Sequence, residues 1–426
     1  MATFTAETYQ NEYLAEGASE VNAVVTVTAG GATGAGGSPG GAPEANEIIM
    51  LDCSGSMAQP MTKLRAAQTA TATAIDCLRD GVWFAVIRGT GQADMVYPAQ
   101  PGLVPANPET KRQAKWAVGQ LTASGGTAIG TWLALARSLF ALRPQAIHHA
   151  ILLTDGKDES ERRQDFQAAL AACEGQFQCD CRGVGTNWTV SELRAVATTL
   201  LGTVDIIAQP ADMAADFRAM IDAAMSKAVN QVALRLWTPQ AATVKFVKQV
   251  SPTIEDLTAK ATPVNPLTAD YPTGAWGQES RDYHLCISVQ PAAVGNEMLA
   301  GRVSLVVDTE VVSQALVKAV WTDDAALSTR INNAVAHYTG QAELAQVIQE
   351  GLEARKAGDE TAATAKLGRA VQLAAASGNE ATTSLLAKVV EVDDAATGKV
   401  RLRRAVDDAD EMALDTRSTK TTRVKP

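Results

Sequence analysis

The chain contains few aromatic residues, no long apolar run and no long basic stripe. Aromatic residues make up 5% of its 426 residues, and charged residues make up 20%. No stretch approaches the ~18 to 20 apolar residues that would span a bilayer, so we expect no membrane span. The net charge of -10 argues against nucleic acid as a partner.

The N-terminus lacks the basic and apolar regions that make up a secretion signal. The six cysteines are scattered, apart from Cys173, Cys179 and Cys181, and they do not resemble a disulfide framework. A zinc tetrad needs a fourth ligand, and none lies near these three thiols in the sequence. The last two thiols alternate along an expected strand, as small core residues do. We therefore expect a cytoplasmic protein.

The length of the chain predicts two or three domains, because a single hydrophobic core usually stops growing well before this size. Residues 1–30 hold alternating apolar positions that predict one or two strands. Residues 31–45 are rich in Gly and Ala and predict a flexible linker. Two strands are too short to fold alone, so we expect them to pair with strands elsewhere in the chain.

Strand-like and helix-like segments alternate through residues 46–229. Helical patterns separate five short apolar runs that predict buried strands: Ile48–Leu51, Val82–Ile87, Ala150–Thr154, Phe177–Val184 and Thr203–Ala208. This alternation is typical of an α/β domain with an open, doubly wound and mostly parallel sheet.

Three further regions follow. Residues 230–325 alternate apolar and polar positions between Pro and Gly, which predicts a small β-sandwich that residues 1–30 complete. The α/β domain is then an insertion in this sandwich. Residues 326–415 are rich in Ala, Glu, Lys and Gln and predict an α-helical region. Residues 416–426 contain four basic residues and no acidic one, which predicts a disordered, Thr-rich tail.

Five oxygen-bearing side chains follow predicted strands or precede a predicted helix of the α/β domain. Asp52 ends the first strand, and Ser54 and Ser56 follow it at alternating positions. Thr127 ends a Ser-Gly-Gly-Thr loop before a helix, and Asp155 follows another buried strand. Loops at the carboxyl ends of parallel strands form one crevice, so we expect these side chains to meet. Hard cations such as Mg²⁺ prefer such oxygen ligands.

The set Asp52-x-Ser54-x-Ser56, Thr127 and Asp155 resembles the metal-ion-dependent adhesion site of von Willebrand factor A domains. The resemblance implies that the three hydroxyls bind the ion directly, while the two carboxylates often act through water. It implies Mg²⁺, with Mn²⁺ or Ca²⁺ as alternatives, and a protein partner whose Asp or Glu takes the last coordination position. An Asp-Ser-Ser run alone could merely cap a helix, but three matching segments at strand ends favour the cation site.

The flanking regions resemble those of intracellular bacterial members of this superfamily. Some of these members are linked to Ser/Thr kinases, phosphatases and forkhead-associated domains, which the resemblance implies as partners. In that setting, Thr416, Thr419, Thr421 and Thr422 are candidate phosphorylation sites that an Arg-lined pocket could read. The alternative is a solvated terminus without a role.

The residues favour binding over catalysis. A magnesium-dependent phosphohydrolase usually needs a second carboxylate beside the first, whereas Ser54 stands two residues after Asp52. No Gly-rich phosphate loop and no Ser, His and Asp set stands out. We therefore predict a magnesium-dependent interaction module or adaptor and no enzyme. The alternatives are a scaffold that binds partners through its helical region around a structural metal site, and the phosphohydrolase.

Overall fold

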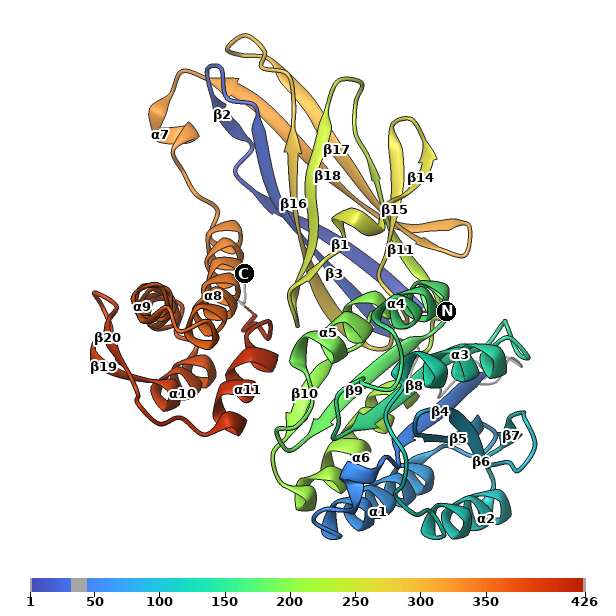
Figure 1. The fold of residues 1–426 in the computed structure, drawn as a ribbon. Coiled ribbons are helices and arrows are strands. Elements are labelled where there is room, and N and C mark those ends of the chain that lie inside the picture. The colour runs from blue at the N-terminus through green and yellow to red at the C-terminus, as the bar shows by residue number, and fades with distance from the viewer. Residues whose placement is uncertain (1, 32–43, 424–426) are drawn as a thin grey trace. The chain divides into compact units, whose positions relative to one another are not determined.

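The computed structural model describes residues 2–31 and 44–423. The chain folds into two compact units (Figure 1). One unit is a continuous segment, Ser38–Asn230, and the other joins Met1–Gly37 to Gln231–Pro426. Most of the predicted linker, residues 31–45, lies outside the described residues. No helix among the described residues is long and apolar enough to cross a membrane.

The continuous unit is built on one sheet whose strands lie in the order β10-β9-β8-β4-β5-β6, with β7 paired to β5. Five strands run parallel, namely β4 (Ala45–Asp52), β5 (Trp83–Gly89), β8 (Ile147–Thr154), β9 (Gln178–Val184) and β10 (Val204–Ile207). Two edge strands run antiparallel, β6 (Ala93–Tyr97) and β7 (Val104–Pro105). The prediction of an open, mostly parallel sheet is confirmed.

Helices cover both faces of this sheet. One face carries α1 (Thr62–Cys77), α2 (Pro108–Gly119) and α6 (Met213–Met225), and the other carries α3 (Ile129–Phe140), α4 (Arg163–Cys173) and α5 (Val190–Thr199) (Figure 1). Two single turns complete the unit, η1 (Gly55–Ala58) and η2 (Pro210–Asp212). Every residue of β4 is buried, as expected for a parallel strand covered on both sides.

The two ends of this unit meet at the start of β8. The Ile147 N–H donates to the Glu44 carbonyl at 2.8 Å, and the Asn230 side chain donates to the Ala146 carbonyl at 3.1 Å. A domain whose ends lie together fits into a single connection of another domain. This arrangement explains how the segment interrupts the β-sandwich without separating its strands.

The second unit begins with a β-sandwich of two sheets. The first has the order β1-β3-β16-β12-β13, from β1 (Ala2–Gln10), β3 (Glu20–Gly31), β16 (Glu279–Ser288), β12 (Thr243–Ser251) and β13 (Glu255–Asp256). The other has the order β14-β15-β11-β17-β18-β2, from β14 (Thr262–Asn265), β15 (Thr268–Pro272), β11 (Val232–Trp237), β17 (Glu297–Val307), β18 (Glu310–Thr322) and β2 (Tyr13–Ala15). A short turn, η3 (Thr258–Lys260), follows β13.

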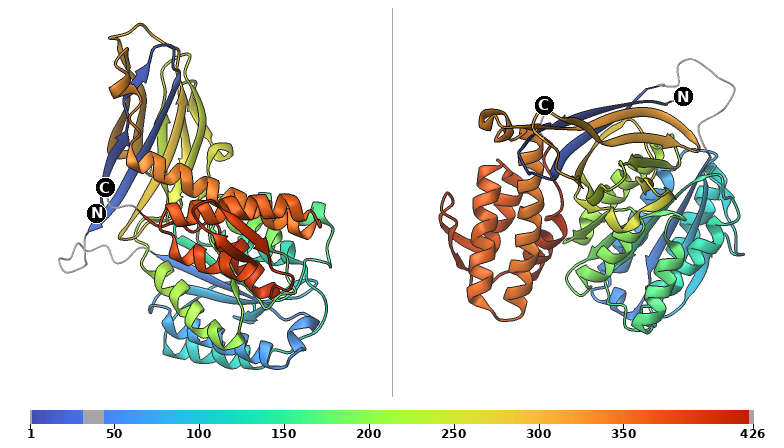
Figure 2. Two further views of the ribbon diagram at one scale, coloured as in Figure 1. Left: turned by 90° about the vertical axis from the view of Figure 1, so that its left-hand side faces the viewer. Right: turned by 90° about the horizontal axis from the view of Figure 1, so that it is seen from above.

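The N-terminal strands complete this sandwich, as predicted. Strand β3 pairs antiparallel with β16 over ten residue pairs, from Glu20 opposite Ser288 to Ala29 opposite Glu279. Figure 2 shows the N-terminal strands alongside strands from the second half of the chain. Burial alternates along β11, because one face of each strand packs on the opposite sheet.

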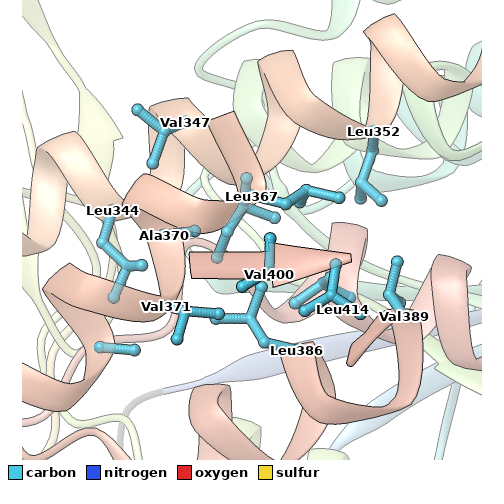
Figure 3. Packing of buried hydrophobic residues seen from close by; sticks show 13 residues of the cluster. Leu344, Val347, Leu352, Leu367, Ala370, Val371, Leu386, Val389, Val400 and Leu414 are labelled. Atoms are coloured by element: carbon cyan, nitrogen blue, oxygen red, sulfur yellow. The ribbon is translucent and has the colours of Figure 1, made fainter. Parts of the chain in front are cut away.

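The helical region follows the sandwich. It contains α7 (Ala325–Ser328), α8 (Asn333–Lys356), α9 (Glu360–Ala376), α10 (Glu380–Val389) and α11 (Asp408–Arg417). Gly358 and Gly378 end α8 and α9 with φ of 79° and 63°, which glycine adopts without strain. Figure 3 shows side chains from four of these helices pointing toward one another in a shared core, among them Leu344, Leu367, Leu386 and Leu414.

A hairpin interrupts the helical region, where the sequence predicted only helices. Strand β19 (Val390–Asp394) pairs antiparallel with β20 (Lys399–Leu402). Val390 and Val400 are buried in the core of the helices. The Thr397 hydroxyl donates to Asp394 at 2.8 Å across the turn. The hairpin forms because β-branched residues here lie on either side of a turn sequence.

The predicted disorder of residues 416–426 is wrong for the part of the tail that the structure describes. Thr416 lies in the last turn of α11 and is 1% exposed. Beyond it, the Thr419 carbonyl accepts the Ile254 N–H at 2.8 Å, and the Thr421 hydroxyl donates to the Val250 carbonyl at 2.6 Å. The tail is ordered because its polar groups find partners on the β-sandwich, which composition alone does not reveal.

Candidate functional site

The five predicted site residues come together at one edge of the parallel sheet. Asp52 is the last residue of β4, and Asp155 directly follows the neighbouring strand β8. Ser54 and Ser56 lie at the start of η1, and Thr127 lies just before α3. Parallel neighbouring strands end at the same edge of a sheet, so the two carboxylates lie close together.

Backbone hydrogen bonds fix the two loops that carry the hydroxyls. The Gly55 N–H donates to the Gly125 carbonyl at 2.9 Å, and the Ser124 N–H donates to the Cys53 carbonyl at 2.7 Å. The loop after β4 is therefore tied directly to the loop before α3. This pairing brings Thr127 to the two serines.

Each carboxylate of the site accepts hydrogen bonds from within the chain. The Oδ1 atom of Asp52 accepts the Ser54 N–H at 2.7 Å, and its Oδ2 atom accepts the Thr154 hydroxyl at 2.5 Å. The Ser56 hydroxyl donates to Asp155 Oδ1 at 2.5 Å and lies 2.9 Å from the Ser54 hydroxyl. Hydrogen bonds therefore link four of the five site residues in a chain, Asp52 to Ser54, Ser54 to Ser56 and Ser56 to Asp155.

Burial governs the electrostatics of Asp52. Loss of solvent raises the pKa of this carboxyl to about 6, against the lowering effect of hydrogen bonds from Ser54 and Thr154. The nearby charge of Asp155 raises the pKa further. A site that crowds two buried carboxylates is stabilised by a nearby positive charge.

Gly156 allows the backbone to approach the site closely. A Cβ atom at this position would lie 3.1 Å from Thr127 Oγ1, 3.4 Å from Ser56 Oγ and 3.9 Å from Asp52 Oδ2. A side chain would therefore crowd the space among three site oxygens. This glycine was not among the predicted site residues, although its place directly after Asp155 is a usable signal.

Lys63 also belongs to the site and was not predicted. Its Nζ atom lies 2.7 Å from Asp155 Oδ2, and the two side chains are 11% and 0% exposed. A signal existed in the sequence, because Lys63, Ala67, Ala70 and Ala74 share one face of α1, which is buried. A lysine on an otherwise small and apolar helix face calls for a buried partner.

The hydroxyls face an open hollow of about 420 Å³. Ser54, Ser56 and Thr127 line it together with glycine backbone and a polar rim, formed by Lys157, Glu159, Ser160 and Asn187. Asp52 and Asp155 are buried behind this lining. Within the described residues, no three His, Cys, Asp or Glu side chains gather closely enough to hold a metal, so a cation here would depend on hydroxyl ligands. Oxygen donors of this kind fit a hard divalent cation.

The four predicted phosphorylation sites lie in different surroundings. Thr416 is buried in α11, Thr419 and Thr421 are half-buried, and Thr422 is exposed. The hydroxyl of Thr416 donates to the Met412 carbonyl at 2.9 Å. In this fold a kinase has no access to Thr416, while the Thr422 side chain is open to solvent.

Two models of known protein families match this chain. The model of the von Willebrand factor type A domain matches residues 46–206, and that of the von Willebrand factor type A C-terminal domain matches residues 372–418. An uncharacterised protein of Synechocystis is 30% identical over 223 residues, 50% of each chain. The match thus spans about half the length of that curated relative.

Solved structures extend the likeness to the whole chain. The von Willebrand factor type A protein from Catenulispora acidiphila is 52% identical, with a TM-score of 0.95, over 99% of this chain and 98% of its own. The ArnB paralog VWA2 from Sulfolobus acidocaldarius shares the fold at 12% identity, with a TM-score of 0.57, over 98% of each chain. This chain belongs to the von Willebrand factor type A family.

Proposed function

We propose that this protein is a metal-dependent protein-interaction module. Ser54, Ser56 and Thr127 would bind a Mg²⁺ ion directly, with Asp52 and Asp155 behind them. The last coordination position would take an Asp or Glu of a protein partner. Three hydroxyls facing an open hollow in front of two buried carboxylates are the observation that carries this proposal.

The chemistry of the donors supports this assignment. The three hydroxyls bring no charge to a divalent cation and the two carboxylates would act on it only from a distance, so the cation would still attract an anionic ligand from outside. When bound, the cation supplies the positive charge that links the two proteins. Members of this family commonly act as protein-interaction modules and often bind a metal at this site. Mn²⁺ and Ca²⁺ are the alternatives to Mg²⁺.

The lining of the hollow gives no support to catalysis. Among the described residues that form it there is no His or Cys, and Glu159 supplies a single carboxylate at the rim. A hydrolase usually needs a positioned nucleophile or base next to the bound substrate. We therefore propose an adaptor role and no enzymatic activity. A cytoplasmic location remains a prediction from the sequence.

A link to Ser/Thr phosphorylation and to forkhead-associated domains remains a prediction from the resemblance. Thr416 is buried, so the candidate phosphorylation sites that remain accessible are Thr419, Thr421 and Thr422. Mass spectrometry of the chain purified from its source would test whether any of these residues carries phosphate.

The proposal is tested by calorimetric titration of Mg²⁺ into the full chain. We expect one ion per chain in the wild type and no binding in Thr127→Ala, because that change removes one hydroxyl ligand. Ser124→Ala is the matched control, since it removes an exposed hydroxyl of the same loop that does not line the hollow. Absence of heat in the wild type, or equal binding in both variants, would contradict the metal site.

The partner is tested separately by capture from the source lysate with Mg²⁺ or with a chelator. Proteins retained only with Mg²⁺ and lost in Thr127→Ala support the interaction module. Proteins retained equally in chelator would move the interaction away from the hollow, for example to the helical region.

A further inference from the structure

Lys63 is held in a fixed place beside the site. It lies in the first turn of α1, and its Nζ atom is 2.7 Å from Asp155 Oδ2. Gly185 directly follows β9, and a Cβ atom at this position would lie 4.0 Å from Lys63 Cε. Both partners of the ion pair are buried, so solvent screens this pair much less than a surface pair.

The lysine changes the charge of the site. Asp52 and Asp155 bring two negative charges, and Lys63 cancels one of them, which leaves one net negative charge among the three buried groups. Lys157 and Glu159 at the rim carry opposite formal charges, so together they add no net charge to this count. A divalent cation would therefore leave the site with one net positive charge, and a partner carboxylate would bring it to neutrality.

Without the lysine, the net charge of the site would differ at each binding step. The two carboxylates alone would already neutralise a divalent cation, and an incoming carboxylate would leave an excess negative charge. The presence of Lys63 thus weakens the attraction for the cation and strengthens the attraction for the anion that follows it. Coulomb interactions of this kind are large in a partly buried site.

We propose that Lys63 weakens the binding of the cation and strengthens the binding of the acidic partner that follows it. This inference rests on the proposed function, because it assumes the cation site at Ser54, Ser56 and Thr127. The competing interpretation is that Lys63 only stabilises the fold by pairing with Asp155. The two interpretations predict different effects of removing the lysine. A purely structural lysine would support both binding steps, so its loss would lower both affinities, whereas our proposal predicts changes of opposite sign.

The test uses the full chain as wild type, Lys63→Met and a matched control, Arg65→Met. Arg65 is an exposed cation on the same helix two residues further on, so its loss removes the same charge at a solvated position. Calorimetry measures the affinity for Mg²⁺. At saturating Mg²⁺, the affinity for acetate is measured from the rise in Tm with acetate concentration, against chloride at equal ionic strength.

We expect Lys63→Met to raise the affinity for Mg²⁺ about tenfold and to lower the affinity for acetate about tenfold, within the usual range of coupling between sites. The control should leave both affinities unchanged. Loss of both affinities in Lys63→Met, or no change in either, would overturn the proposal. Should this variant not fold, Lys63→Gln, which retains a donor for Asp155, is judged by the same criteria.

The outcomes separate this inference from the proposed function. A wild type that binds no Mg²⁺ contradicts the metal site itself. A wild type that binds Mg²⁺, with both affinities moving in the same direction in the lysine variant, leaves the metal site intact and removes only the role of Lys63.

Discussion

Arg423 binds Asp282 through two hydrogen bonds, from Nε to Oδ2 and from Nη2 to Oδ1, each 3.0 Å long. Asp282 is 2% exposed and also accepts hydrogen bonds from Tyr338 at 2.5 Å and from Thr26 at 2.6 Å. One carboxylate therefore joins β3, β16, α8 and the C-terminal segment. Removing a partner from a buried charge costs more than the pair contributes.

Replacing Arg423 should therefore destabilise the chain. Because its side chain is 36% exposed, solvent screens the pair, and we expect Arg423→Met to lower the free energy of unfolding by about 1–2 kcal/mol. Urea denaturation measures this change. Arg404→Met, at an exposed arginine of the helical region, should change stability by less than about 0.5 kcal/mol. Equal effects of the two substitutions would show that the Asp282 contact does not hold the tail.

Two neighbouring threonines of the tail should respond differently to the same change. The Thr421 hydroxyl donates to the Val250 carbonyl at 2.6 Å, whereas the Thr422 side chain is exposed. We expect Thr421→Val to cost about 1 kcal/mol, the usual net value of a hydrogen bond, and Thr422→Val to cost almost nothing. Thermal denaturation compares them, and equal Tm values would argue against a docked tail.

Titration of His149 should contribute to the pH dependence of stability. Burial alone would lower the pKa of His149, but the charge of Glu47 and hydrogen bonds to Asp180 and Glu47 outweigh it and raise this pKa to about 10. The unfolded chain has a histidine pKa of about 6.5. A raised pKa stabilises the folded state fully below about pH 6.5, and this contribution is lost as the pH rises through about 10.

We therefore expect the free energy of unfolding to fall between pH 7 and pH 10 by at least about 1 kcal/mol in the wild type. In His149→Gln the fall should be smaller, because the titrating group is gone. His148→Gln is the control, since the neighbouring side chain points to the other face of β8 and binds backbone carbonyls. Urea denaturation at both pH values measures the difference, and a slope that persists in His149→Gln would contradict the assignment.

Gly156→Ala should impair metal binding more than folding. The added Cβ atom would lie 3.1 Å from Thr127 Oγ1, so the hydroxyl must move by a few tenths of an ångström. We expect the affinity for Mg²⁺ to fall at least about tenfold, since metal sites tolerate little displacement, with little change in Tm. Gly119→Ala, with open space around the new atom, is the control. Unchanged Mg²⁺ affinity in Gly156→Ala would place the cation elsewhere.

The α/β fold and the proximity of the five site residues could be predicted from short sequence patterns. Asp52 and Asp155 each stand at the end of an apolar run, and the topology of parallel sheets brings such ends together. The contact of Lys63 with Asp155 was missed because a lysine on a buried helix face departs from the usual distribution of charge. Its partner lies 92 residues away.

The tail and the hairpin were missed for different physical reasons. Thr421 and Arg423 bind partners 171 and 141 residues away. The basic, Thr-rich composition of the tail does not predict such distant contacts. The hairpin occupies a short stretch within an Ala-rich and Glu-rich region, where helical propensity dominates a wide window. Val390 of β19 and Val400 of β20 are both buried in the core of the helical region. Tertiary packing therefore determines the local structure here.

The inserted position of the α/β unit also determines the order in which the chain can fold during synthesis. Strand β3 ends at Gly31, but its partner β16 begins at Glu279, so the ribosome must complete the whole insert before these strands can pair. The insert finds its own core within one continuous stretch and can fold while the early strands wait. Strands β2 and β3, made before the insert, therefore reach their partners β18 and β16 only after it, the reverse of the usual N-terminal-first order.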